Sequence, residues 1–195
     1  MNDVKKKILT KSSELFVKQG VRRTSMDEIS SSLSISKRTV YECFRSKEEL
    51  LKICVLNRIE EYKNEVEIKT RGIQAVDAIK CLNSLLYTQL IDLPQPFLEE
   101  IMCSEKIMKM MVKEYYIPLS ELCNRLLDEV RKTDRIKKEI SNECIIAFFK
   151  HILLTSVVAG KKRLSYDTYL HFIDMYWAGI METDCSSSIK PKETL

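Results

Sequence analysis

The stretch Thr24–Leu51, TSMDEISSSLSISKRTVYECFRSKEELL, carries the signals of several helix starts in fewer than thirty residues. Ser25 and Glu28 have the S-x-x-E spacing of a capping box, in which the serine hydroxyl and the glutamate carboxylate satisfy free backbone amides at the start of a helix. Ser46 and Glu49 repeat this spacing. A helix is therefore expected to begin directly after each of these two serines.

A third helix start lies between them at Ser36, which can cap a short helix over 37–43. Another short helix is predicted over 26–33, because apolar residues follow Ser25 at helical spacing. They are Met26, Ile29 and Leu33. Two short helices joined by a tight turn form a helix-turn-helix, whose second helix enters the major groove of DNA. A longer helix is expected to follow from Lys47 to about residue 69.

Glycine is scarce in the whole chain, which has four where an average chain of this length has roughly 14. Each one follows the end of an apolar pattern of helical period, where a left-handed C-cap favours glycine. They are Gly20, Gly72, Gly160 and Gly179. A first helix over 3–19 is expected before Gly20, and further helices from Ile73 onward, with a kink or break at Pro118. The chain is therefore predicted to be all-α.

Composition excludes several classes of protein. Hydrophobic residues make up 45% and charged residues 31%, and no run approaches the ~18 apolar residues of a membrane span. The N-terminal residues lack the apolar core of a signal peptide, so we expect a cytoplasmic protein that does not insert into a membrane. The sequence also has no phosphate loop and no G-x-S-x-G or H-E-x-x-H motif, which argues against an enzyme and against a cofactor.

The seven cysteines are scattered singly, with no C-x-x-C pair, and neither of the two histidines belongs to such a cluster. This spacing does not predict a metal site. In a reducing compartment the cysteines are best interpreted as buried thiols that behave as small hydrophobic residues, with a redox role as the alternative.

Positive charge is concentrated at the N-terminus. Residues 1–52 contain 12 Lys and Arg against seven Asp and Glu, whereas the remaining residues contain 20 against 21. A basic module on a near-neutral body is the charge distribution expected of a nucleic-acid-binding protein, although an ordinary solvated face is the alternative.

The spacing of these features resembles the N-terminal signature of the TetR family of bacterial transcription regulators. The resemblance covers about the first quarter of the chain and is most specific in TVYECFRSKEELL, residues 39–51. Other matching positions are Ile8, Leu9, Leu15, Phe16, Gly20, Thr24, Ser25, Ile29, Leu33, Ser36 and Lys37. Two positions depart from the family pattern. Ser30 replaces the usual alanine, and Ser34 replaces the usual turn glycine, which predicts a positive φ that costs serine more than glycine.

The resemblance implies a domain organisation. A three-helix DNA-binding domain over 1–46 would precede a helical ligand-binding and dimerisation bundle over 47–181, with about nine helices in total. The tail over 182–195 has no helical pattern and is expected to be disordered.

The resemblance also implies which residues contact DNA. Lys37 and Arg38 are the candidates for reaching base edges, since a guanidinium can bond guanine O6 and N7 together. Thr39 and Tyr41 match positions that touch phosphate or bases, and Lys47 matches a lysine that contacts the DNA backbone beside a helix start. The full predicted set is Thr24, Ser25, Ser36, Lys37, Arg38, Thr39, Tyr41 and Lys47. For each, ordinary capping or surface solvation is the alternative.

By the same resemblance, the body would hold a pocket for a small apolar or amphipathic effector. Met-rich and aromatic segments offer an adaptable lining for such a ligand. The candidate residues are Tyr87, Phe97, Met102, Met108, Met111, Tyr115, Phe148 and His151. Such residues equally suit an ordinary core, and His151 equally suits a hydrogen-bonded interior or interface position.

The last two predicted helices, ECIIAFFKHILLTSVVAG and YDTYLHFIDMYWAGI, are rich in aromatic residues. The resemblance implies that these helices pack against a second subunit as a four-helix interface, and aromatic enrichment suits such an interface. The candidate residues are Phe149, Ile152, Tyr169, Phe172, Ile173, Tyr176 and Trp177. The alternative is that they form the core of one subunit.

The expected function is that of a homodimeric repressor that binds a palindromic operator in double-stranded DNA and is released by a small-molecule effector. Two modules related by a twofold axis are needed because one covers only a few base pairs. The alternative is a DNA-binding regulator without a small-molecule ligand, whose body serves only for dimerisation or for binding a protein partner.

Overall fold

The computed structural model describes residues 3–132, 136–158 and 163–182. Within these ranges the chain forms α-helices joined by short loops, one π-helical segment and no β-strand beyond an isolated bridge between Ile136 and Met181. The helices are α1 (Asp3–Gln19), α2 (Met26–Ser32), α3 (Lys37–Cys43), α4 (Lys47–Thr70), α5 (Ala75–Ile91), α6 (Gln95–Met102), α7 (Glu105–Met111), η1 (Val112–Tyr116), α8 (Ile117–Arg131), α9 (Asn142–Val158) and α10 (Tyr166–Ile180). The predicted all-α fold is confirmed. The predicted tail over 182–195 lies outside the described residues except for Glu182.

Serine side chains start the short helices as the sequence predicts. The hydroxyl of Ser25 accepts a hydrogen bond from the amide of Glu28 at 3.1 Å. Ser36 accepts from the amide of Thr39 at 3.0 Å, and Ser46 accepts from the amide of Glu49. Each bond satisfies one of the amides that lack a partner in the first turn of a helix. These caps fix where α2, α3 and α4 begin.

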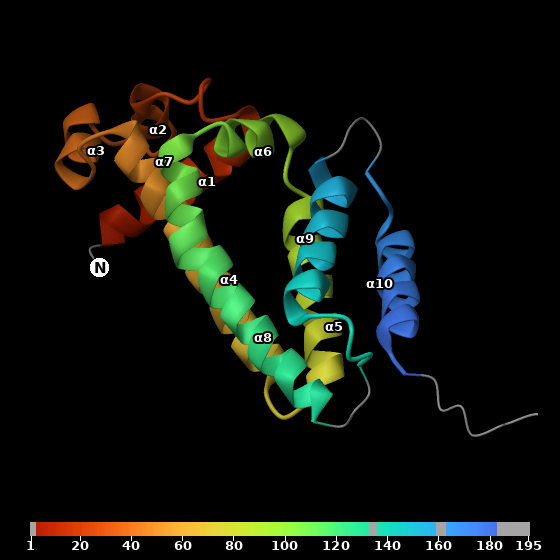
Figure 1. The fold of residues 1–195 in the computed structure, drawn as a ribbon. Coiled ribbons are helices and arrows are strands. Elements are labelled where there is room, and N and C mark those ends of the chain that lie inside the picture. The colour runs from red at the N-terminus through yellow and green to blue at the C-terminus, as the bar shows by residue number, and fades with distance from the viewer. Residues whose placement is uncertain (1–2, 133–135, 159–162, 183–195) are drawn as a thin grey trace, which may run out of the picture.

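We call α1, α2 and α3, with the first two turns of α4, the head. In Figure 1 the head occupies one end of the molecule and α10 the opposite side. Its core is a compact set of fully buried side chains that comes from all four helices. They are Ile8, Phe16, Ile29, Val40, Phe44 and Leu50. Because each helix buries only one apolar face, the opposite faces of α2 and α3 remain available to solvent.

The turns of the head require unusual backbone conformations. Ser34, between α2 and α3, has a φ of 54°, which confirms the predicted positive φ. Gly20 and Gly72 also have positive φ, as expected of helix C-caps. Gly179 differs from the prediction, since it lies inside α10, and Gly160 lies outside the described residues.

The rest of the molecule, which we call the body, is built around α5. This helix packs against α4, α8, α9 and α10 and supplies the buried Ile79, Leu82 and Tyr87. The predicted interruption near Pro118 is a π-helical segment, η1, directly before α8. Proline lacks a backbone N–H and crowds the preceding turn, and a widened turn relieves both effects.

Helix α6 lies between the head and the body (Figure 1). Its Leu98 belongs to the core of the body, whereas its Ile101 belongs to the core of the head. Ile107 of α7 also enters the head core. The two cores therefore meet at α6 and α7.

Candidate nucleic-acid interface

The outward face of α3 carries the polar side chains of the predicted recognition helix. Val40 is fully buried beneath it and anchors the helix to the head. Arg38 has a side chain that is 88% exposed, and the Tyr41 ring is 44% exposed. Lys37 and Ser36 are also exposed, and Thr39 is half-buried. The structure thus brings five of the eight predicted DNA-binding residues together on one surface.

Acidic neighbours hold the two cations of this surface. The ammonium of Lys37 lies 2.6 Å from a carboxylate oxygen of Asp27 on α2. The guanidinium Nε of Arg38 lies 2.8 Å from Glu42, one turn later on α3. The hydrogen bond that Lys37 donates to Asp27, together with the negative charge of this carboxylate, raises the pKa of Lys37. Sequence reasoning did not single out Asp27, and DNA has to exchange with both carboxylates to reach the cations.

Thr24 differs from the prediction because its hydroxyl serves the head internally. The side chain is only 1% exposed. Its Oγ1 donates to the carbonyl of Gly20 at 2.8 Å and accepts from the Gln19 amide at 3.2 Å. Both partners belong to the end of α1 and the loop that follows it. Thr24 therefore shapes the approach to α2 and does not present its hydroxyl to DNA.

Lys47 and Ser25 also form hydrogen bonds within the head. The Lys47 ammonium donates to the carbonyls of Val21 and Thr24, each at 2.9 Å. These bonds use two of its three N–H groups and tie the start of α4 to the loop before α2. Ser25 is exposed, and its hydroxyl already caps α2. A contact between either residue and DNA would be additional to these structural roles.

The eight predicted effector-pocket residues do not line one cavity. Phe97 and Met111 pack against the core of the head. Tyr87 is fully buried and stacks on Tyr169 within the body. Met102 and His151 are exposed, while Met108 is half-buried on α7 and Phe148 stacks on Tyr176. The prediction is therefore wrong as a set, because a sequence pattern cannot assign Met and aromatic residues to one of two cores.

An apolar cavity of about 290 Å³ does lie between α4 and the segment formed by η1 and α8. Tyr115 is the one predicted residue in its lining. The hydroxyl of Tyr62 is buried there without a hydrogen-bond partner, and burial raises the pKa of this phenol. The neighbouring Tyr115 hydroxyl contributes to the same shift. The complete lining is Tyr62, Lys63, Val66, Glu67, Thr70, Tyr115, Pro118, Leu119, Leu122 and Arg125.

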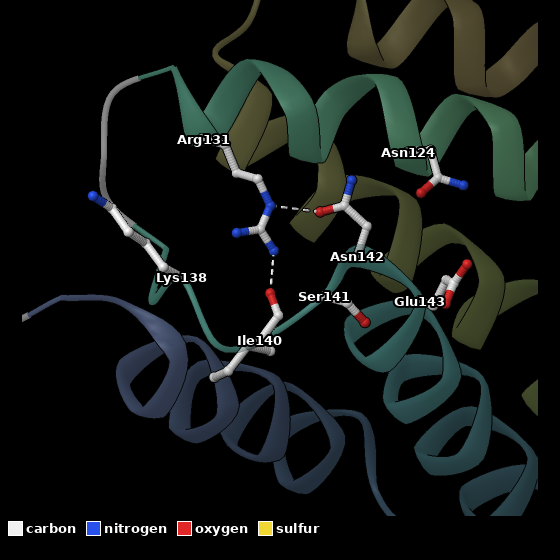
Figure 2. A pocket seen from close by; sticks show the side chains of 7 residues that line it. All are labelled: Asn124, Arg131, Lys138, Ile140, Ser141, Asn142 and Glu143. Atoms are coloured by element: carbon white, nitrogen blue, oxygen red, sulfur yellow. Dashed lines mark hydrogen bonds between the residues drawn. The ribbon is translucent and has the colours of Figure 1, made fainter.

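A second, more open pocket lies where α8 approaches the start of α9, as Figure 2 shows. Arg131 donates through Nε to the side-chain oxygen of Asn142 at 2.7 Å and also to the carbonyl of Ile140. Asn142 in turn donates to Asp128 at 2.8 Å. These groups bond to one another across the pocket, so the arrangement fastens α8 to α9.

Most of the predicted interface residues are buried inside the single chain. Tyr169, Ile173 and Trp177 on α10 and Phe149 and Ile152 on α9 all belong to the core of the body. This part of the prediction is wrong, because both helices are amphipathic and these residues occupy their inner faces.

The outer surface of α10 carries the remaining candidates. Phe172 is 43% exposed, and its neighbour Met175, which sequence reasoning did not single out, is 69% exposed. Tyr176 is half-buried.

Comparison with known proteins agrees with this architecture. Residues 8–54 match the family model described as bacterial regulatory proteins, tetR family. The N-terminal quarter of the chain is therefore similar to the TetR family. The match covers α2 and α3 completely and includes the start of α4, so the residues that form the exposed α3 surface lie inside the matched segment. No curated protein sequence matches the chain.

Solved structures share the TetR-type fold over nearly the whole chain. A putative transcriptional regulator from Saccharomonospora viridis, in complex with choline, has 16% identity and a TM-score of 0.74 over 94% of this chain and 100% of its own. A TetR/AcrR-family regulator from Thermobifida fusca has 20% identity and a TM-score of 0.68 over 90% and 97%. The regulator FadR from Bacillus subtilis, in complex with stearoyl-CoA, has 13% identity and a TM-score of 0.68 over 86% and 96%.

Two kinds of feature are absent from the residues that the structure describes. None of the helices there is long and apolar enough to cross a membrane. The same residues contain no group of three or more His, Cys, Asp or Glu side chains that could hold a metal ion.

Proposed function

We propose that this chain is a TetR-family transcriptional regulator, a sequence-specific repressor that binds a palindromic operator as a homodimer and is released by a small-molecule effector. The outward face of α3 carries the proposal. It presents Arg38, Lys37 and Tyr41 on a short helix that Ser36 caps and Val40 anchors. A helix held in this way can enter the major groove without rearrangement of the head.

The order of side chains on α3 suits reading of base edges. Lys37 and Arg38 lie in its first turn, which is the end of a recognition helix that reaches the floor of the groove. An arginine there can form a bidentate contact with guanine, and a lysine can contact the same acceptor atoms. Tyr41 lies one turn later than Lys37, where its hydroxyl can reach a phosphate. We therefore assign base contacts to Arg38 and Lys37 and a backbone contact to Tyr41.

We infer that a second copy of the chain packs against the outer faces of α9 and α10. The outer face of α10 exposes Phe172 and Met175. The neighbouring face of α9 exposes Cys144, Ala147 and His151 at helical spacing. Small and aromatic side chains on two adjacent helices allow close packing against the same pair of a twofold-related copy. The division into a DNA-binding part over 1–46 and a dimerising body over 47–181 belongs to this proposal.

Dimerisation is tested by the mass of the protein in solution. Met175→Glu places a charge in the centre of the proposed interface and is expected to shift the protein from dimer to monomer in sedimentation velocity. Ile68→Glu is the matched control, because Ile68 is equally exposed on α4 but lies outside the interface. A monomeric parent protein, or a Met175→Glu variant that remains dimeric, contradicts the proposed interface.

For the effector, we propose the cavity between α4 and α8. Its apolar wall and the charged Lys63 and Arg125 suit a ligand with an apolar body and one anionic group. Two structural neighbours are described as complexes with choline and with stearoyl-CoA, which supports a ligand in a body of this fold. The volume of about 290 Å³ is at the low end for a ligand site. That observation favours the second candidate function, regulation without a small molecule.

Selection of bound sequences from a random duplex pool tests the proposed function. An inverted repeat enriched by the parent protein supports it. A screen by thermal shift then separates the two candidates, because an effector that binds the native state raises the melting temperature. Arg125→Ala removes a positive charge from the lining and is expected to weaken effectors that have an anionic group.

A further inference from the structure

The loop between α1 and α2 is held by a carboxylate from the body. Glu100 on α6 accepts hydrogen bonds through Oε2 from the amide of Val21 at 2.5 Å and from the amide of Arg22 at 3.2 Å. A β-carbon added to the neighbouring Gly20 would lie 3.2 Å from Glu100 Oε1. The carboxylate therefore lies directly against the loop backbone, where a side chain at position 20 would crowd it.

The same loop is held from its other side by a cation. Lys47 at the start of α4 donates to the carbonyls of Val21 and Thr24. Val21 thus has its N–H bonded to an anion and its C=O bonded to a cation. Charge-assisted hydrogen bonds are roughly twice as strong as neutral ones. The loop is therefore held between α6 and α4, and both of these helices extend beyond α1, α2 and α3.

Helix α6 is placed to transmit movement because it contributes to both cores. Leu98 packs in the body, and Ile101 packs in the head. Glu100 lies between these two residues in the sequence and points to the loop. At the other end of α6, Arg163 donates to the carbonyl of Leu93 at 2.6 Å and also to that of Ile91, so the linker before α6 is fastened to the body.

We propose that Glu100 is a positioning residue that sets the orientation of the head relative to the body, through the amides of Val21 and Arg22. The loop leads directly to Ser25 and the start of α2, which packs against α3. A rearrangement of the body that moves α6 has to carry this loop with it or release the carboxylate. Either outcome changes how the loop before α2 and α3 is held, so Glu100 is one contact through which the body controls DNA binding. This inference rests on the proposed function.

The test measures the contact and the orientation by NMR on the full-length protein. In Glu100→Ala, the amides of Val21 and Arg22 are expected to exchange with solvent about tenfold faster or more, because each loses a charge-assisted bond. Residual dipolar couplings of head and body amides are expected to fit one alignment tensor in the parent and to require two in Glu100→Ala. Glu100→Gln keeps an acceptor oxygen, so its amide exchange and its alignment tensor are expected to stay close to those of the parent.

Glu99→Ala is the matched control. Glu99 is the neighbouring carboxylate on α6, and it is exposed and bonded only to Gln95 in the described contacts. The proposal is overturned if Glu100→Ala keeps the exchange rates of the parent, or if its couplings still fit one tensor. If Glu100→Ala does not fold, Glu100→Asp replaces it as the test. The Asp side chain is one CH2 shorter, so it is expected to lose the protection of the Val21 and Arg22 amides that Glu100→Gln keeps, and equal protection in the two variants overturns the proposal.

DNA binding adds a separate readout. Glu100→Ala is expected to lower operator affinity about tenfold, as the loss of one charge-assisted contact implies. If the parent protein selects no DNA sequence, the proposed function fails, and the NMR result still decides whether Glu100 orients the head. If the parent selects an operator and Glu100→Ala binds it equally well, control of DNA binding through Glu100 is wrong.

Discussion

Lys37 on α3 forms an ion pair with Asp27 on α2, with 2.6 Å between the ammonium and the carboxylate oxygen. The pair joins the two helices of the helix-turn-helix on their solvent side. It also neutralises one of the two cations in the first turn of the recognition helix. The negative charge of Asp27 weakens the attraction between this surface and phosphate for every DNA sequence. Selection among sequences then depends on the contacts with bases.

Asp27→Asn is therefore expected to increase affinity for DNA of any sequence. The substitution removes the negative charge that pairs with Lys37 and makes the α3 surface more positive, so we expect a gain of roughly three- to tenfold at ~0.1 M salt and a salt dependence steeper by about one unit. Fluorescence anisotropy across a salt series measures both quantities. Asp77→Asn, on exposed α5 surface in the body, is the control. Unchanged affinity for random duplex would show that the pair does not limit binding.

Ser34→Gly is expected to stabilise the protein. The φ of 54° costs serine more than glycine, and this gain exceeds the entropy that glycine loses on folding, for a net gain of about 0.5 kcal/mol. Ser31→Gly is the control, because Ser31 is an exposed residue inside α2. There the substitution costs about 0.5–1 kcal/mol. Thermal unfolding measures the change in stability of each variant relative to the parent. A gain in Ser34→Gly with a loss in Ser31→Gly confirms the strain at Ser34, whereas a loss in both argues against it.

The helix starts of the head were predictable because they depend on residues that are close in sequence. The hydroxyls of Ser25, Ser36 and Ser46 each bond an amide three residues later. The positive φ of Ser34 was implied by the family resemblance, in which glycine is usual at this turn position. The contact from Glu100 was not predictable, since nothing in a sequence pattern relates residue 100 to the amide of Val21.

Membership of the two cores was also beyond the sequence pattern. Leu98 and Ile101 have the same helical spacing as any amphipathic pair, yet one packs in the body and the other in the head. The same limit explains why Phe97 and Met111 were wrongly assigned to an effector pocket. The buried Tyr169 and Trp177 were assigned to a subunit interface for a related reason, since aromatic richness marks a core and an interface equally.

Gly20→Ala is expected to cost more stability than Gly72→Ala. Both glycines have positive φ, so an alanine at either position costs about 1 kcal/mol or more. A β-carbon at position 72 meets nothing within 4 Å, whereas one at position 20 lies 3.2 Å from the Glu100 carboxylate. Chemical denaturation of the two variants gives the difference. Equal losses would mean that the carboxylate moves aside without cost.

Cysteine reactivity is expected to report on the proposed dimer. Cys103 and Cys144 are exposed in the single chain, whereas burial raises the pKa of Cys54 to about 12 and that of Cys123 to about 11. The thiolate is the reactive form, so Cys54 and Cys123 should stay unmodified by a thiol reagent at pH 7 to 9, while exposed thiols react faster as pH rises. Peptide mapping by mass spectrometry follows each site.

Cys144 lies on the proposed interface, so it should react slowly with the thiol reagent in the parent dimer. In Met175→Glu it should react as fast as Cys103, which lies outside the interface on the turn after α6. If Cys144 reacts at the same rate in both proteins, α9 is not part of the interface.

Discrimination between DNA sequences by Arg38 tests the central claim most directly. Titration of the parent protein against its selected inverted repeat and a shuffled duplex of the same composition is expected to show a preference of about a thousandfold or more. Arg38→Ala should reduce discrimination at one base pair per half-site by roughly tenfold or more while its affinity for the shuffled duplex falls far less. A parent protein that binds both duplexes equally, or an Arg38→Ala variant with undiminished preference, would contradict the assignment of α3 as the surface that reads DNA.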